Sequence, residues 1–176
     1  MNKLKTAEIG IDTGQQEQVS RKLLAVYCER EALMNCIRAT QWNTQDSRSA
    51  EFNQMLSAFT PESQYQQQRP TQSSCNPNIQ SFAPSNQIAE RISINGYCVP
   101  ADYVDLKEHS KINAAMKGTT VQENTTQLSA ACEQFTRTTR EAIETARQAK
   151  DAASIQALTD QLRPAEQLAT QLKRFQ

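Results

Sequence analysis

Proline and glycine divide this sequence into two stretches that can form long helices and an irregular middle. Five of the six prolines lie between residues 61 and 100, and the chain has only four glycines. Proline breaks helices and glycine weakens them, so the segments before and after this region are the ones suited to long helices. The punctuation favours a mainly α-helical chain with a helical front and a helical back.

The helical front carries apolar residues at three- and four-residue spacing, which is typical of a helix with one buried face. This spacing predicts a first helix over residues 15–40 and a second over 47–59. The inward residues of the first are Val19, Leu23, Val26, Leu33 and Ile37. Those of the second are Phe52, Met55, Leu56 and Phe59.

The helical back shows the same spacing over three segments, residues 101–117, 120–150 and 152–175. In the first of these, Val104, Ile112 and Met116 are expected to face inward. Pro164 is expected to kink or split the last helix, because proline removes a backbone donor and crowds the preceding turn. The last two segments are expected to form an antiparallel helical hairpin joined near Asp151.

The middle of the chain predicts two non-helical features. Residues 64–87 are polar and interrupted by proline, which favours a long surface loop. Residues 91–99 alternate apolar side chains on both sides of Asn95-Gly96, a pair typical of a tight β-turn, which predicts a small β-hairpin. The expected fold is therefore a single mainly α domain over residues 1–176. It is a helical bundle of four to five helices with this inserted hairpin, and residues 1–14 form a flexible N-terminal segment.

Charge and hydropathy exclude two classes of partner. The chain has 19 Lys plus Arg against 19 Asp plus Glu, so no basic excess attracts nucleic acid. No apolar run approaches the roughly 18 residues that a membrane span needs. We therefore expect neither nucleic acid nor a membrane span, and a partner that is another protein or a second copy of the chain.

Five cysteines are unusual for a cytosolic helical protein of this size. None of their spacings matches a zinc site, and the sequence has one histidine. We therefore interpret Cys28, Cys36, Cys75 and Cys98 as disulfide candidates and Cys132 as a buried thiol. This interpretation predicts an extracytoplasmic protein, periplasmic or secreted. The alternative is a cytoplasmic protein with free thiols.

The sequence shows little catalytic machinery. His109 stands four residues after Asp105, a spacing that could orient a general base, but exposed pairs of this kind are common on helix surfaces. Glu141 and Glu144 lie in a run of mixed charge, which is typical of a solvated helix face. With no glycine-rich phosphate loop, we expect no enzyme, no cofactor and no metal site.

These observations favour a non-enzymatic interaction or structural subunit of a larger assembly, of an extracytoplasmic, secretion or virion type. Two alternatives remain: a small inhibitor or immunity protein that blocks a partner enzyme, and a helical bundle that binds a small molecule or a peptide. Leu168, Leu172 and Phe175 form one face at the chain end. They either belong to the protein's own core or form an interface with a partner.

Overall fold

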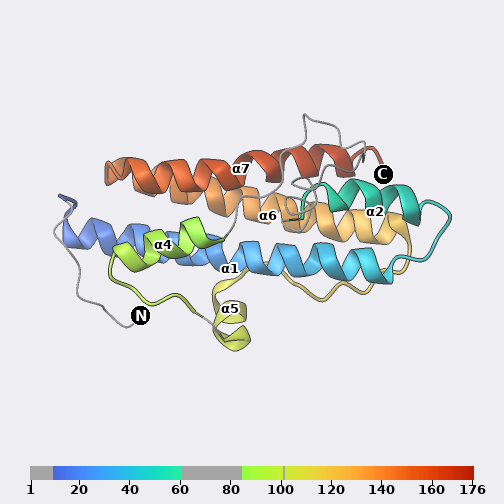
Figure 1. The fold of residues 1–176 in the computed structure, drawn as a ribbon, viewed down its shortest axis with the longest axis horizontal. Helices are drawn as coiled ribbons and strands as arrows, with labels where there is room; N and C mark the ends of the chain where they lie inside the picture. The colour runs from blue at the N-terminus through green and yellow to red at the C-terminus, as the bar shows by residue number, and fades with distance from the viewer. Residues whose placement is uncertain (1–9, 61–84, 101) are drawn as a thin grey trace, which may run out of the picture.

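The computed structural model describes residues 10–60, 85–100 and 102–176. Its described residues form three long helices and three short ones (Figure 1). The long helices are α1 (Thr13–Asn43), α6 (Val121–Gln148) and α7 (Ala152–Leu172). The short helices are α2 (Ser49–Ser57), α4 (Asn86–Ile94) and α5 (Tyr103–His109). The prediction of a mainly α-helical bundle is confirmed.

The short helices α2 and α4 together fill the fourth position of a four-helix bundle. Helix α2 lies beside the end of α1, where Asn53 Nδ2 donates to the Gln41 carbonyl at 3.0 Å. Helix α4 lies at the opposite end, where an Arg91 nitrogen donates to Asp151 Oδ1 at 2.9 Å. Both pieces run antiparallel to α1 (Figure 1).

Residues 95–120 then cross the length of the bundle and carry α5 on the way (Figure 1). At the end of this crossover the Gln45 N–H donates to the Thr119 carbonyl at 2.8 Å, so α6 starts where α1 ends. Helix α7 returns along α6. The bundle therefore runs up in α1, down in α2 and α4, down again in α6 and up in α7, with one long crossover connection.

Side-chain caps start each long helix. Asp12 accepts from the Gly14 N–H at 2.9 Å before α1, and Asp151 accepts from the Ser154 N–H at 3.0 Å before α7. Before α6, Thr120 and Glu123 form a reciprocal capping box. The turn at Asp151 confirms the predicted helical hairpin of α6 and α7.

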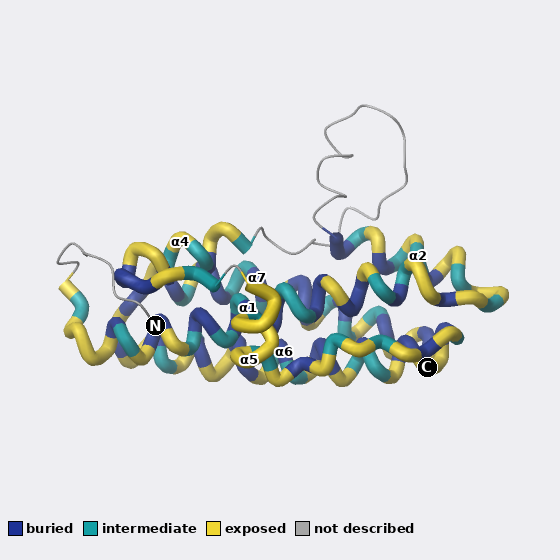
Figure 2. The backbone as a smooth tube through the Cα atoms, turned by 90° about the horizontal axis from the view of Figure 1, so that it is seen from below, coloured by how far each residue is buried: buried dark blue, intermediate teal, exposed yellow. Residues whose placement is uncertain are grey.

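The core runs along the axis of the bundle, where buried residues from all four positions face one another (Figure 2). The largest fully buried side chains include Phe52, Phe59, Phe135, Leu23, Leu33 and Leu128. Small residues on α6 let its neighbours approach closely, namely Ala131, Ala142 and Ala146. The core is thus built mainly from Leu, Ile, Val and Phe side chains, with alanines concentrated on α6 and α7.

The predicted β-hairpin over residues 91–99 is wrong, because residues up to Ile94 belong to α4. Asn95-Gly96 ends this helix instead of forming a hairpin turn. Gly96 has φ +86°, its N–H donates to the Ser93 carbonyl, and the Tyr97 N–H donates to the Ile92 carbonyl. These two bonds form a Schellman cap, in which glycine supplies the left-handed residue.

The predicted helix over residues 101–117 is also wrong in its extent. Only Tyr103–His109 is helical, and Ser110 is already extended. Val104, expected inward, is 57% exposed, while Ile112 is buried. An extended residue advances about 3.3 Å against 1.5 Å in a helix, so an extended crossover reaches the far end of the bundle with fewer residues.

Two further expectations concern α7 and the polar loop. Pro164 does not split the last helix, since α7 runs through it from Ala152 to Leu172. Of the predicted loop over residues 64–87, residues 64–84 lie outside the described part of the chain, and residues 86–87 already belong to α4. Most of the flexible segment expected over residues 1–14 also lies outside it, although α1 starts at Thr13.

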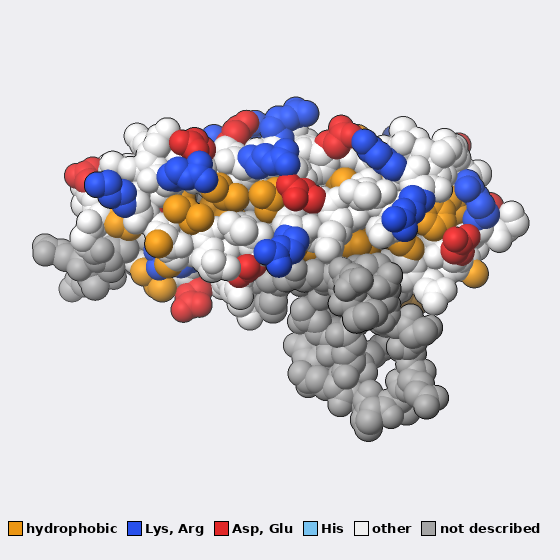
Figure 3. Space-filling view, turned by 90° about the horizontal axis from the view of Figure 1, so that it is seen from above, with side chains coloured by type: hydrophobic (Ala, Val, Ile, Leu, Met, Phe, Trp, Pro, Cys, Tyr) orange, Lys and Arg blue, Asp and Glu red, His pale blue; other side chains and the backbone are white. Residues whose placement is uncertain are grey.

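The surface carries charges of both signs. Figure 3 shows Lys and Arg mixed with Asp and Glu across one face, and Arg140 bridges α6 to Glu166 of α7 at 2.7 Å. Among the helices that the structure describes, none is long and apolar enough to cross a bilayer.

Candidate functional site

A pocket of about 400 Å³ lies between α1, α5 and the crossover segment that follows α5. We call it the α1–α5 pocket. Its α1 wall is formed by Cys28, Glu31, Ala32 and Asn35, and its α5 wall by Tyr103, Leu106 and Lys107. Helix α5 buries none of its own residues, and Tyr103 stays 62% exposed. Figure 2 shows α5 as an exposed element laid on the outside of the bundle.

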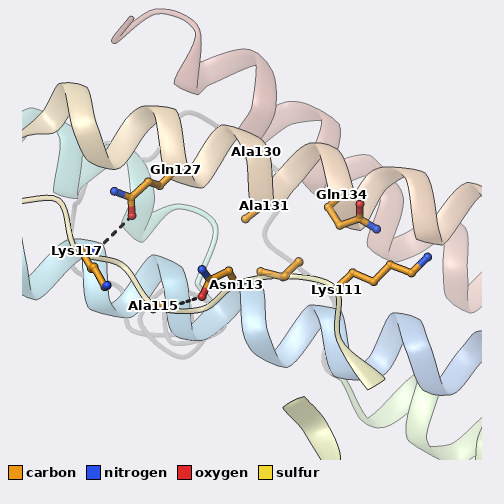
Figure 4. A pocket seen from close by; sticks show the side chains of 9 residues that line it. Lys111, Asn113, Ala115, Lys117, Gln127, Ala130, Ala131 and Gln134 are labelled. Carbon is orange, nitrogen blue, oxygen red and sulfur yellow. Dashed lines mark hydrogen bonds between the residues drawn. The ribbon is translucent and has the colours of Figure 1, made fainter. Parts of the chain in front are cut away.

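A second pocket, of about 460 Å³, lies between α6 and the crossover segment (Figure 4). Lys111, Lys117, Gln127 and Gln134 line it. The Lys117 N–H donates to Gln127 Oε1 at 3.3 Å, which ties the crossover to α6. The lining side chains are mostly amides, alanines and solvated lysines, so this pocket contains no pair of groups suited to acid–base chemistry.

Beneath this pocket, Glu29 of α1 is fully buried. Gln134 Nε2 donates to Glu29 Oε1 at 3.3 Å, and the Lys111 N–H donates to the same oxygen at 3.4 Å. The other oxygen, Oε2, is buried without a hydrogen-bond partner among the described residues. Loss of solvent on burial raises the pKa of Glu29, and the nearby Thr138 hydroxyl and the hydrogen bonds from Gln134 and Lys111 only partly offset that rise.

The next residue, Arg30, is also buried and faces α7. Its Nε donates to Gln161 Oε1 at 3.1 Å, and its Nη1 donates to Glu31 Oε1 at 2.8 Å. Burial lowers the pKa of Arg30, and the neighbouring Glu31 opposes that shift. The middle of the bundle therefore contains a buried guanidinium paired with Glu31 and a buried carboxyl group that accepts from Gln134 and Lys111.

The structure keeps the described cysteines as free thiols. Cys28, Cys36 and Cys132 are buried, Cys98 is exposed, and Cys75 lies outside the described residues. Burial raises the pKa of Cys28 to about 12 and that of Cys36 to about 11, so both are protonated at neutral pH. The prediction of disulfides is wrong for the described cysteines.

The other acidic and basic residues singled out from the sequence lie on the surface of α5 and α6. Asp105 and His109 are both exposed on α5. Glu141 accepts from Lys22 at 3.0 Å and Glu144 from Arg147 at 2.6 Å, both on the surface.

The apolar face at the chain end lies inside the bundle. Leu168 and Leu172 are fully buried, and the ring of Phe175 lies 5.1 Å from that of Phe52. These side chains therefore contribute to the protein's own core.

No protein-family model and no curated protein sequence matches this chain. Solved structures do match its fold. The DPS protein from Vibrio cholerae O1 has a TM-score of 0.77 and 16% identity, and the match covers 99% of each chain. DpsC from Streptomyces coelicolor has a TM-score of 0.78 and 14% identity, covering 98% of this chain and 91% of that one. An archaeal Dps homologue from Halobacterium salinarum has a TM-score of 0.78 and 15% identity, and the match covers 99% of this chain and 87% of that one.

The chain therefore has the fold of Dps proteins, and the Vibrio protein is described as a member of a broad superfamily of ferritin-like diiron-carboxylate proteins. This full-length match contradicts the predicted subunit of a secretion-type or virion assembly, together with its inhibitor and ligand-binding alternatives. The predicted extracytoplasmic location is wrong as well, because its main support was a disulfide framework and the described cysteines are free. The prediction that the chain is not an enzyme gains no support from these matches.

The fold raises the question of a di-iron centre, and the residues present do not fit one. Such centres in ferritin-like bundles use a Glu from each of two helices and a Glu-x-x-His pair from each of the other two. This sequence has one histidine, His109, and the residue three positions before it is Leu106. Within the described residues, no three His, Cys, Asp or Glu side chains converge on a metal-binding arrangement. The buried Arg30 also brings a positive charge into the bundle, which is unfavourable for a centre of two cations there.

Sequence reasoning missed the two buried charged residues of α1 and the exposed aromatic residues. Glu29 and Arg30 interrupt the apolar spacing of the first helix, and charged residues are seldom fully buried unless they are paired. Trp42, at the end of the same helix, is 84% exposed. A sequence can reveal the interruption, but only the arrangement of the helices shows which of these residues are inside.

Proposed function

We propose that this protein is a ferritin-like protein of the Dps type, which self-associates into a homo-oligomer and takes iron as its cargo. The observation that carries the proposal is the end-to-end match with the Vibrio DPS protein, which covers 99% of both chains. A match of this extent includes the crossover and the short helix on it, not only four helices that many unrelated bundles share.

The topology supports the same proposal. Ferritin-like folds have one long crossover connection, whereas simple bundles have short loops throughout and cytokine bundles have two crossovers. Here residues 95–120 form that single long connection, and they cross from one end of the bundle to the other (Figure 1).

The surface supports self-association. Large aromatic side chains are enriched at protein interfaces, because they bury a large apolar area at low entropic cost. Trp42 and Tyr103 are 84% and 62% exposed, and Val104 is exposed beside Tyr103. The mixed charges and zero formal net charge add no strong repulsion between copies.

Iron enters the proposal as substrate or cargo rather than as a resident centre of the bundle. The support for iron is the superfamily to which the Vibrio protein is assigned. The buried carboxylates among the described residues are Glu29 and Asp151, and Asp151 is already occupied by Arg91 and Ser154. Iron that this protein takes up is therefore held by the assembly, outside the core of a single bundle.

The test is an iron-loading experiment on the full chain. The purified protein is incubated in air with several equivalents of ferrous sulfate per chain and then separated by size, with protein and iron measured in every fraction. We expect iron to co-elute with an oligomer. Iron that elutes apart from the protein would refute the cargo assignment, and a chain that elutes as a monomer would refute the assembly itself. Serum albumin treated in the same way controls for non-specific iron binding.

A further inference from the structure

Asn95-Gly96 is the only Asn-Gly pair in the sequence, and it stands where α4 ends. Asn95 is the residue that caps the end of α4, and it is 1% exposed. Neither its Nδ2 nor its Oδ1 has a hydrogen-bond partner among the described residues. Such groups are uncommon, because each unsatisfied buried polar group costs free energy. The carboxamide of Asn95 is therefore held in place by packing alone.

The backbone nitrogen of Gly96, in contrast, has a partner. Its N–H donates to the Ser93 carbonyl at 2.9 Å. This bond is one half of the Schellman cap, and the bond from the Tyr97 N–H to the Ile92 carbonyl, at 3.1 Å, is the other half. The Gly96 nitrogen can also react with the side chain of Asn95. The cap bond and this reaction compete for one N–H, because the nitrogen must give up its proton to react.

The reaction converts an Asn-Gly pair into a cyclic imide. The Gly96 nitrogen forms a bond to Cγ of Asn95, and the bond from Cγ to Nδ2 breaks. The proton of the attacking nitrogen goes to Nδ2, which leaves as ammonia, and a succinimide ring remains. Water then opens the ring at either carbonyl and gives aspartate or isoaspartate. Because glycine has no side chain to hinder the approach, Asn95 is the asparagine of this chain whose neighbour most favours the ring.

The fold suppresses this reaction in two ways. Burial of Asn95 keeps out the water and base that the reaction needs, and the cap bond keeps the Gly96 N–H engaged. Both protections are lost when the end of α4 opens, and helix ends open at a lower free energy than the core of a protein. We propose that Asn95 is a site of spontaneous deamidation, which is reached through opening of the α4 cap. This proposal does not depend on the proposed function.

The products prevent the cap from re-forming. Aspartate places a charge at a buried position where the asparagine side chain already has no partner, and an unpaired buried charge costs more than an unpaired amide. Isoaspartate adds a carbon to the main chain before Gly96, which displaces both cap bonds. Because the crossover begins at residue 95, deamidation turns a transient opening into a lasting release of the α4 end and of the start of the crossover.

The test follows Asn95 by peptide mass spectrometry during incubation of the full-length protein at neutral pH, folded and in guanidine. Labelling with an isoaspartyl methyltransferase identifies isoaspartate. In the unfolded chain, we expect Asn95 to be modified faster than every other asparagine. In the folded protein, its modification should be at least about tenfold slower, in proportion to the open fraction. Equal rates in the two states would overturn the protection by the cap, and a faster asparagine elsewhere in the unfolded chain would overturn the site.

Two matched variants test the route through opening. Ile92→Val removes a buried methylene group from α4 and should raise the rate in the folded protein about two- to tenfold. Ile94→Val makes the same change at an exposed position of α4 and should leave the rate unchanged. Equal rates in Ile92→Val and in the parent protein would overturn opening of α4 as the route.

Hydrogen exchange over residues 86–97 measures the consequence. In protein aged until Asn95 is modified, these amides should exchange at least about tenfold faster than in fresh protein. Asn95→Ser has no carboxamide to close the ring, so its exchange rates should be the same before and after ageing. Aged parent protein that contains modified Asn95 and keeps the exchange rates of fresh protein would overturn the lasting release.

Discussion

Glu29→Gln is expected to stabilise the protein at neutral pH. Glu29 is fully buried, and only one of its two carboxyl oxygens accepts hydrogen bonds, at 3.3 and 3.4 Å. The other oxygen has no partner among the described residues. Glutamine has nearly the same shape and can keep the accepting oxygen, but it carries no charge to desolvate.

The magnitude follows from the cost of a buried polar group without a partner, about 1–3 kcal/mol and more when it is charged. Burial raises the pKa of Glu29 in the folded chain, so the unfolded chain loses this proton first as the pH rises. Above the ordinary pKa of about 4.3, the folded state therefore binds more protons than the unfolded state, and stability falls until the pH passes the raised pKa. The increase in the free energy of unfolding from Glu29→Gln should be near zero at pH 4 and reach about 1–3 kcal/mol at pH 7.

Thermal melts of both proteins between pH 4 and pH 8 measure this difference. For a chain of this size, 1 kcal/mol corresponds to about 2–4 °C in Tm. Glu133→Gln, at an exposed position of α6, is the matched control and should change stability by less than about 0.5 kcal/mol. A Glu29→Gln variant that is less stable than the parent protein at pH 7 but equally stable at pH 4 would refute the reasoning. It would mean that an ionised Glu29 is a net stabilising group.

The remaining predictions concern two helix ends and the chain terminus. Gly96 and Lys150 both have positive φ at the ends of helices, +86° and +56°. Gly96→Ala should therefore lower the free energy of unfolding by about 1 kcal/mol, and Lys150→Gly should raise it by up to about 1 kcal/mol. Chemical denaturation measures both changes, and changes of the same sign would contradict the strain argument. Phe175→Ala should lower stability by about 3 kcal/mol, because the ring is buried against Phe52. A melt unchanged by Phe175→Ala, with weaker self-association, would instead assign the ring to an interface.

The long helices were predictable because their apolar spacing persists over many turns. Residues 15–40 and 120–150 each repeat that spacing often enough that no other element accounts for it, and the helix ends in the structure differ from these bounds by only a few residues. Asp151 was predictable as the α6–α7 turn because it can cap the helix that follows. Local signals of this kind need no knowledge of the rest of the fold.

The errors occur where one local pattern is compatible with two structures. Asn95-Gly96 suits both a hairpin turn and a helix end, and the spacing of Ile88 and Ile92 on α4 decided for the helix. The cysteine pattern suited both disulfides and buried thiols, and the packing of α1 against α6 is what buries Cys28, Cys36 and Cys132 as thiols.

The most direct test of the central claim is the native mass of the full chain at micromolar concentration. The account predicts a homo-oligomer, with a mass that is a whole multiple of 19.8 kDa and with no second protein in it. A species of 19.8 kDa that persists as the concentration is raised would contradict self-association, and with it the proposal that the chain functions as a Dps-type protein.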